Sequence, residues 1–486
     1  MYSTPLAAQR TAGPLPFWAH LMGRIPTAGR YPVICGLFSC WRQCSEFREI
    51  HRRGDRRLST VLVSLMLSSL SMIVCSGSSP TKPPDSTVGP TALVTRSFGD
   101  APVAGELSLV PPIDTSVWQY TVDLDGNGSP DRAGELNETI ELDYAFEQSG
   151  IHVIPLTFTS ESRTVKDTVF VIVNNPAAST IELMITAQER IHGLTFADGS
   201  IFTTTQHSVE RRSLENLQVT DSLVVGGPPE TRLRGISPST EGDLYVINAS
   251  RSEVLKIQLP SFTNDRSIAI PEMSNVLVDA RRNDRLYTGG PEGVSVVDAS
   301  DGRVLTQRQS IPGRFFAVGP QSTRVAIAVG GPSPRILILD GESLEEIWSV
   351  SVREMLPSIV AFSADETAVY VLGLDADTTL HYTALAASDG AMIRDLILEP
   401  CPFCFIDVGT SAFAHLGSLA LIPTFNGTYV IDSAVHLPVH RIGEPDLISI
   451  ACCDVTSDPS SDRIYLRVQG NSLWRVNIVQ TTSLEE

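Results

Sequence analysis

The chain has 486 residues, of which 42% are hydrophobic and 19% are charged, and its formal net charge at pH 7 is −19. This length allows two or three domains, and the ordinary balance of residue types excludes a largely disordered chain. Residues 76–486 alone carry a net charge of −25, so this part repels polyanions, and we exclude nucleic acid as a partner.

The amino-terminal residues have the order of an export segment. Residues 1–57 form a basic leader with nine Arg and three acidic residues, which we do not expect in the mature protein. Residues 58–74 contain no charge and are followed by Cys75 and small residues. This order resembles a bacterial lipoprotein signal, in which residues 58–75 hold the apolar region and the lipobox, and the resemblance implies lipidation of Cys75 in the cell envelope.

Two alternatives to lipidation stay open. Val74 and Met72 depart from the usual lipobox, so simple secretion after cleavage near Gly77 is the first alternative. An uncleaved anchor is the second, although an apolar stretch of 17 residues is short for a membrane span of about 20 residues. In each case we expect membrane contact only through an amino-terminal lipid or signal anchor.

Residues 76–90 are rich in Ser, Pro and Gly and predict a flexible tether. From residue 91 to residue 175, short runs that alternate apolar and polar residues are separated by turn clusters, which predicts an all-β sandwich. The stretches YTVDLDGNGSPD, DYAFEQSGIHVIPLTFTS and DTVFVIV resemble the PKD-type immunoglobulin-like domain. This resemblance implies an immunoglobulin-like sandwich that acts as a spacer or adhesion module.

The stretch DLDGNGSPD within this region has the spacing of a calcium loop. Asp123, Asp125, Asn127 and Asp131 occupy positions one, three, five and nine, and a glycine follows at the sixth. The twelfth position is Gly134 in place of the usual Glu, so the bidentate ligand of an EF-hand is absent. Two interpretations remain open, namely a Ca²⁺ site and a plain Asx-rich turn between two strands.

One short phrase recurs seven times in the rest of the chain, in which a polar turn leads into a run of apolar residues. The copies begin at Ser200, Asp243, Arg285, Arg324, Ala368, Ser418 and Arg463. Their spacing of 39 to 50 residues, with several strand-like runs in each copy, is typical of a β-propeller. We therefore predict an all-β protein with a seven-bladed propeller over residues 180–480, preceded by the small sandwich.

The last copy lacks an outer strand. Residues 180–187 (TIELMITA) belong to no complete copy, so we expect them to pair with residues 472–478 and close the ring. Phrases such as AFSADETAVYVLG resemble the YVTN type of propeller repeat found in secreted bacterial proteins. This resemblance allows binding proteins as well as enzymes such as lactonases and cofactor-dependent dehydrogenases, whose sites lie at the mouth of the central channel.

Four cysteines follow Cys75 in the chain, namely Cys401, Cys404, Cys452 and Cys453. They occur at equivalent places in two copies of the repeat, so we expect them near each other on one face. In an exported protein paired cysteines are usually oxidised, which predicts disulfides. A zinc site and free or redox-active thiols are the alternatives, although adjacent cysteines fit tetrahedral coordination poorly.

No nucleophile motif, metalloprotease motif or phosphate-binding glycine loop appears in the sequence. We therefore expect no catalytic residue and no cofactor other than Ca²⁺. The favoured hypothesis is an exported, membrane-tethered binding or scaffold protein whose propeller recognises an envelope protein, an extracellular protein or a surface glycan. The alternative is a propeller enzyme acting at the channel mouth, and a redox or metal protein built on the cysteines is a third hypothesis.

Overall fold

The computed structural model describes residues 89–478 apart from 113–116, 228–230, 271–274, 279–283, 291–292, 310, 312–314, 322, 332, 353–354, 401–413, 425–426, 444–453, 462 and 469–471. The predictions for residues 1–57, residues 58–75 and Cys75 lie outside these residues, as does most of the tether. Within the part of the chain that is described, no helix is long and apolar enough to cross a membrane.

The first eight strands form two facing sheets. One sheet has the order β1–β3–β6, with β1 (Thr91–Val94), β3 (Val103–Val110) and β6 (Ile140–Phe146). The other has the order β2–β8–β7–β4–β5, with β2 (Phe98–Asp100), β8 (Thr164–Asn174), β7 (Gly150–Thr159), β4 (Trp118–Val122) and β5 (Arg132–Leu136).

The core of this sandwich follows the alternation seen in the sequence. Along β7 the buried residues are Ile154, Leu156 and Phe158, while Pro155 points outward, because successive side chains of a strand face opposite sides. These three residues pack against Leu107 and other core residues of the facing sheet. β5 lacks such an alternation, because its RAGEL sequence has a single buried residue at its end.

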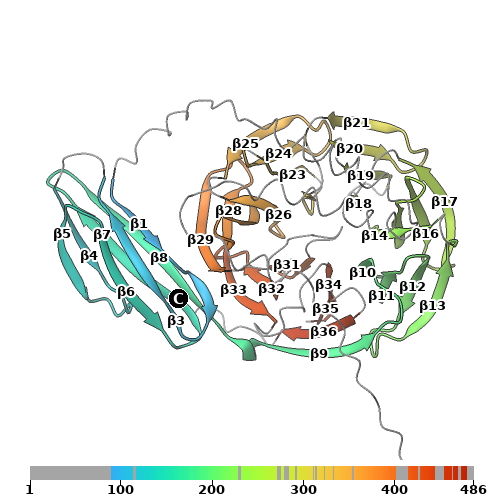
Figure 1. Cartoon of the computed structure of the whole chain (residues 1–486). Coiled ribbons are helices and arrows are strands. Elements are labelled where there is room, and N and C mark those ends of the chain that lie inside the picture. Colours follow the sequence, from blue (N-terminus) through green and yellow to red (C-terminus); the bar gives the residue numbers. More distant parts are fainter. Residues whose placement is uncertain are drawn as a thin grey trace, which may run out of the picture. The chain divides into compact units, whose positions relative to one another are not determined.

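Seven antiparallel sheets of four strands follow within the described residues, and Figure 1 shows them arranged around a common centre. The first three sheets consist of β10 (Gly193–Ala197), β11 (Ser200–Thr204), β12 (Ser208–Arg212) and β13 (Val219–Val224); β14 (Leu233–Pro238), β15 (Asp243–Asn248), β16 (Glu253–Gln258) and β17 (Thr263–Ala269); and β18 (Asn275–Val278), β19 (Arg285–Gly290), β20 (Gly293–Asp298) and β21 (Val304–Gln309).

The next three sheets consist of β22 (Phe316–Val318), β23 (Arg324–Val329), β24 (Arg335–Asp340) and β25 (Glu346–Ser351); β26 (Leu356–Phe362), β27 (Ala368–Leu374), β28 (Thr379–Ala386) and β29 (Met392–Pro400); and β30 (Ala414–Leu416), β31 (Leu419–Thr424), β32 (Gly427–Asp432) and β33 (Leu437–Ile442). The last sheet contains β34 (Asp454–Asp458), β35 (Arg463–Val468), β36 (Ser472–Ile478) and β9 (Ser179–Thr186).

The last sheet joins the beginning and the end of the repeat region. A single turn of 3-10 helix, Pro176–Ala178, leads from β8 into β9. β9 then pairs antiparallel with β36, from Ser472 opposite Thr186 to Ile478 opposite Ser179. The strand expected to supply the missing outer position therefore does so.

The recurring phrase forms the second strand of each sheet. This strand is covered by a neighbouring sheet on each side, so it is buried over most of its length, as in β27. The third residue of the phrase is an aromatic side chain that is completely or almost completely buried in five copies, namely Phe202, Tyr245, Tyr287, Tyr370 and Tyr465. The fourth strand lies at the rim in Figure 1 and is largely exposed in several sheets, as in β13, whereas β33 is mostly buried.

Tyrosines of the phrase also join neighbouring sheets. The hydroxyl of Tyr287 donates to the carbonyl oxygen of Gly341 at 2.7 Å, in the turn after the third strand of the next sheet. Tyr370 makes a hydrogen bond of 3.1 Å to the ring of His436, which lies at the corresponding turn of the sheet that follows its own. In each of these two places, a buried aromatic ring and a hydrogen bond hold a sheet to its neighbour.

Candidate functional site

The predicted calcium loop connects β4 to β5 in the sandwich. Carboxylate oxygens of Asp123, Asp125 and Asp131 lie within 4.8 Å of one another, so the structure brings these three predicted ligands together. Asp123 is buried, with 6% of its surface exposed, whereas Asp125 and Asp131 are exposed. The loop places a compact group of negative charge at the surface, which suits a hard cation with oxygen ligands.

Hydrogen bonds within the loop hold these carboxylates in place. Asp123 accepts from the backbone amides of Asn127 at 3.1 Å and of Gly128 at 2.6 Å. Asp131 accepts from the amides of Leu124 at 2.8 Å and of Asp125 at 3.3 Å. The loop therefore has the hydrogen bonds of an Asx-rich turn as well as the convergent carboxylates of a cation site.

The fourth predicted ligand, Asn127, turns its amide group toward its neighbours. Its Nδ2 donates to Asp125 at 2.7 Å, and its Oδ1 accepts from the amide of Ser129 at 2.8 Å. Gly126 has φ of +71°, and a Cβ there would lie 2.9 Å from the carbonyl oxygen of Val153. A glycine is needed at this position because the loop turns left-handed and packs against β7.

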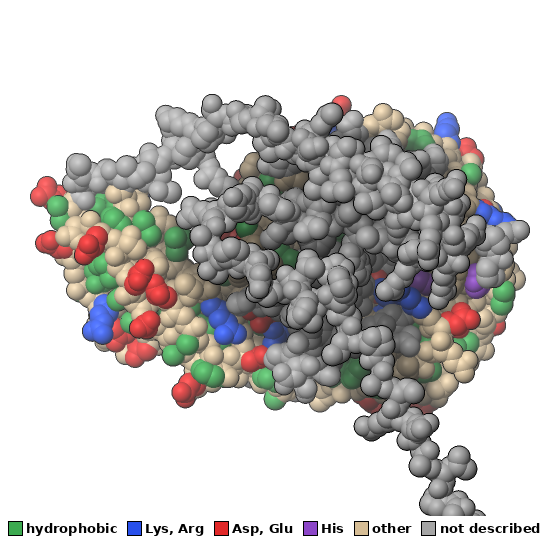
Figure 2. Space-filling view, in the orientation of Figure 1, with side chains coloured by type: hydrophobic (Ala, Val, Ile, Leu, Met, Phe, Trp, Pro, Cys, Tyr) green, Lys and Arg blue, Asp and Glu red, His purple; other side chains and the backbone are tan. Residues whose placement is uncertain are grey.

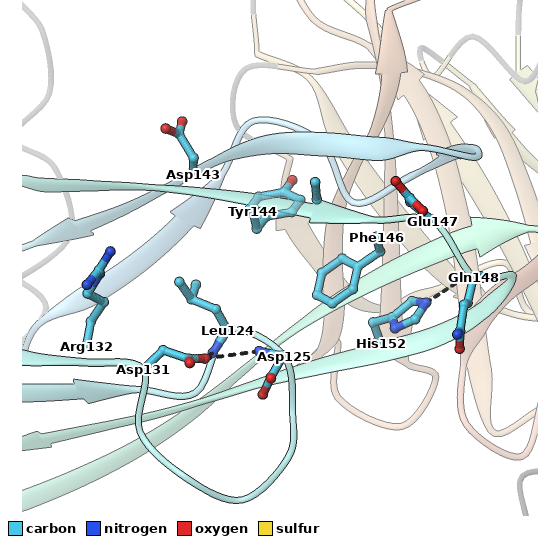
Figure 3. A pocket seen from close by; sticks show the side chains of 11 residues that line it. Leu124, Asp125, Asp131, Arg132, Asp143, Tyr144, Phe146, Glu147, Gln148 and His152 are labelled. Atoms are coloured by element: carbon cyan, nitrogen blue, oxygen red, sulfur yellow. Dashed lines mark hydrogen bonds between the residues drawn. The ribbon is translucent and has the colours of Figure 1, made fainter.

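A cavity of about 670 Å³ adjoins the loop. Figure 3 shows Asp125 and Asp131 beside it, with Phe146 and His152 on neighbouring strands. The rings of Phe146 and His152 are stacked with centroids 4.2 Å apart, and Nε2 of His152 donates to the carbonyl oxygen of Gln148 at 2.7 Å. The His152 ring is therefore engaged on one face and at one nitrogen.

Further acidic residues lie on the facing sheet of the sandwich. Glu106 on β3 is opposite Asp143 on β6, and the charge of Glu141 is the main cause that raises the pKa of Glu106. Figure 2 shows Asp and Glu side chains on the part of the face that the sandwich strands occupy in Figure 1. The sandwich thus presents a negative surface on which a bound cation would be favoured.

The sandwich and the propeller share a buried ion-pair network that the sequence reading did not predict. Arg441 on β33 has a side chain that is 2% exposed, and it pairs with Glu399 on β29 and with Asp100 on β2 of the sandwich. Tyr429 donates a further hydrogen bond to Glu399. No local pattern indicates this network, because Asp100 and Arg441 are 341 positions apart in the chain.

Asn174 and His440 extend the network. Oδ1 of Asn174, at the end of β8, accepts from the amide of Arg441 at 2.9 Å and lies 2.8 Å from Nδ1 of His440. The other ring nitrogen of His440 lies 2.9 Å from the hydroxyl of Ser179. Burial lowers the pKa of His440 to about 4, with the charge of Arg441 acting in the same direction, so this ring is neutral at pH 7.

Other histidines of the propeller also have structural partners. Nε2 of His415 is 2.8 Å from the carbonyl oxygen of Phe362, and Nε2 of His381 is 3.0 Å from Asp375. Burial lowers the pKa of His415. These rings serve hydrogen bonding within the fold.

The predicted disulfide residues Cys401, Cys404, Cys452 and Cys453 lie outside the described residues, and so does the predicted lipidation residue Cys75. Their pairing and modification stay predictions. Of the predicted site residues, the structure therefore describes the four of the acidic loop.

Four-stranded sheets repeated around a centre, each with its first strand innermost, define a β-propeller, and the chain is an all-β protein of that class. No family model and no curated protein matches the chain. Among solved structures it is similar to the β-propeller domain of Cps50 (Swd1) from Myceliophteria thermophila, with 10% identity, a TM-score of 0.48 and coverage of 62% of this chain and 100% of that one. It is also similar to hydrazine synthase from Kuenenia stuttgartiensis, with 12% identity, a TM-score of 0.46 and coverage of 61% and 97%.

Proposed function

We propose that this chain is an exported binding or scaffold protein that uses its propeller to recognise an envelope protein, an extracellular protein or a surface glycan. In this proposal the seven sheets form one seven-bladed, YVTN-like propeller, and the PKD-like sandwich is its spacer. A lipid on Cys75 or a signal anchor tethers the chain, and disulfides join Cys401, Cys404, Cys452 and Cys453.

The observation that carries this proposal is the repetition of one strand order in every sheet. The first six sheets follow the chain from the centre to the rim, and the last does so up to β36 before β9 completes it, so the ring presents the same kind of connection many times, which suits a broad recognition surface. The histidines His381, His415 and His440 are used in hydrogen bonds within the fold, which favours binding over acid–base chemistry at these positions.

The proposal is tested by capturing partners with the purified chain of residues 76–486. We expect enrichment of an envelope protein, or retention on an array of surface glycans, that is lost when the propeller is unfolded by heat. The isolated residues 76–175 serve as the control for binding by the tether and sandwich. Retention of the same partner by this control would assign recognition to the sandwich.

The enzyme alternative has its own test. The same chain is incubated with lactones and with quinone-linked dehydrogenase substrates, and product formation is measured. Turnover that a substitution on an innermost strand abolishes would replace the binding proposal, since innermost strands line the channel where propeller enzymes hold their sites.

The export part of the proposal is tested by intact mass in the native host. We expect a mass that begins at Cys75 with an added lipid. A mass beginning near Gly77 without lipid would indicate simple secretion, and a mass that includes residues 1–57 would contradict export by this segment.

A further inference from the structure

Four arginines meet around His192 where the last sheet, the first sheet and the second sheet adjoin. Arg190 and His192 directly precede β10, Arg232 precedes β14, Arg234 lies in β14, and Arg467 lies near the end of β35. We call these five residues the arginine cluster. No local sequence pattern indicates this cluster, because its positions in the chain span 278 residues.

Thr204 at the end of β11 holds two parts of the cluster together. Its carbonyl oxygen accepts from the amide of His192 at 2.7 Å, and its hydroxyl donates to the carbonyl oxygen of Arg234 at 2.8 Å. Gly193 lies between them, and a Cβ at this position would be 2.9 Å from the Thr204 hydroxyl and 3.1 Å from the Arg234 carbonyl. The first strands of the two sheets therefore approach each other closely at this point.

Arg467 is the buried member of the arginine cluster. Its side chain is 6% exposed, Nη1 donates to the carbonyl oxygen of Ile191 at 3.2 Å, and Nε donates to Asp454 at 2.8 Å. Asp454 thus pairs with Arg467. Arg190 and Arg232 are exposed to solvent, so their guanidinium groups are accessible to a ligand.

The electrostatics of the cluster are opposite to those of the chain as a whole. Burial, followed by the charges of Arg190, Arg467, Arg232 and Arg234, lowers the pKa of His192 to about 4. His192 is therefore neutral at pH 7 and offers a ring N–H without a further charge. Figure 2 shows Lys or Arg side chains beside a His side chain at the place where Figure 1 draws β10 and β11.

Gathered cations repel one another, and this repulsion is relieved when an anion binds between them. Guanidinium groups present planar pairs of donors that match the oxygens of carboxylates, sulfates and phosphates. We propose that the arginine cluster binds an anionic group, a carboxylate or a sulfate or phosphate ester, on the ligand that the propeller recognises. This inference rests on the proposed binding function and names the chemistry of its ligand.

The test compares the binding of inorganic sulfate, inorganic phosphate and acetate by titration calorimetry at constant ionic strength, with chloride as the background anion. The variant R190Q/R232Q removes two exposed charges of the cluster. The control K166Q/R303Q removes two exposed charges elsewhere, since Lys166 is in the sandwich and the Arg303 side chain is 69% exposed in a turn of the third sheet.

We expect at least one oxyanion to bind the unchanged chain and the control equally, and the cluster variant to bind it about tenfold or more weakly, because charge-assisted hydrogen bonds are lost. Equal affinity in both variants, an equal loss in both, or the absence of oxyanion binding would overturn the inference. The more tightly bound anion shows whether a carboxylate or an ester is preferred.

A second measurement separates this inference from the proposed function. The captured partner, or an array of neutral and acidic glycans, is presented to the same two variants. Loss of an acidic partner only in R190Q/R232Q supports both proposals. If R190Q/R232Q retains the partner, the anion site is contradicted while the binding function stands. If an oxyanion binds but no macromolecular partner is found, the anion site stands and the proposed binding function is contradicted.

Discussion

Asp125 shows at the scale of one residue how the acidic loop can be tested. Both of its carboxylate oxygens accept hydrogen bonds from Asn127, and it lies next to Asp123 and Asp131. If Ca²⁺ binds with the weak affinity of extracellular modules, a few millimolar Ca²⁺ stabilises the sandwich by about 1–2 kcal/mol. We expect EDTA to lower the melting temperature of the unchanged chain and to leave Asp125→Asn unaffected.

The control for the calcium experiment is Asp143→Asn, which removes a carboxylate from the same sandwich but outside the group of three. It should keep the response to Ca²⁺. If EDTA changes the melting temperature of Asp125→Asn as much as that of the unchanged chain, the plain turn is supported. The charge of the loop would then have no part in Ca²⁺ binding.

The buried ion pairs of Arg441 contribute to the stability of the protein. Replacing it by Met leaves Glu399 and Asp100 without their shared cation, and such a loss in a buried network costs about 3–5 kcal/mol. Chemical denaturation of Arg441→Met should show this loss. Arg303→Gln, which removes an exposed arginine 4.0 Å from Asp298, should change the free energy of unfolding by less than about 1 kcal/mol.

His440 gives the stability of the protein a predictable dependence on pH. Its folded pKa of about 4 is below the usual value of 6.5, so the unfolded chain binds the proton more readily. The stabilising effect of the neutral ring is complete above about pH 6.5 and is lost as the pH falls toward 4, by at most about 3 kcal/mol. The melting temperature of His440→Gln should decline less over this range than that of the unchanged chain.

The residue contacts were the part that the sequence could not predict. The carboxylates of the acidic loop are close in the chain, so their spacing was sufficient to bring Asp123, Asp125 and Asp131 together. Arg441 and Asp100 meet because β2 of the sandwich lies against β29 of the propeller. Arg467 reaches the carbonyl oxygen of Ile191 because the ring brings β35 beside β10. Periodicity carries no information about such pairs, since it describes burial along one strand at a time.

At the scale of elements, the closure of the ring depends on β9. We expect replacement of residues 180–187 by a Gly/Ser linker of equal length to leave β36 with an unpaired edge, which is a template for pairing with other chains. Size-exclusion chromatography should show dimers and aggregates. A synthetic peptide of residues 179–187 should restore the monomer, and a monomeric, equally stable linker variant would contradict the role of β9.

The elements themselves were predictable to different degrees. The recurring phrase was found because the second strands are buried on both sides and therefore read as continuous apolar runs. The innermost strands were missed, and two of them, β22 and β30, have only three residues each. A strand this short lacks the length over which an alternating pattern can be recognised.

The predicted disulfides would join separate sheets of the molecule. Cys401 and Cys404 precede the sixth sheet, and Cys452 and Cys453 precede the seventh. We expect thiol labelling of the denatured, unreduced protein to find none of these cysteines free. Stoichiometric zinc, with four reactive thiols after its removal, would contradict oxidation.

The pairing of β9 with β36 also sets an order of events during synthesis. β9 emerges early, directly after the sandwich, but its partner is among the last strands to leave the ribosome. During that interval β9 and the growing row of sheets have open edges. The ring can therefore form only after nearly all of the chain has arrived, and a chain cut short before β34 retains both edges and becomes a substrate for chaperones and proteases.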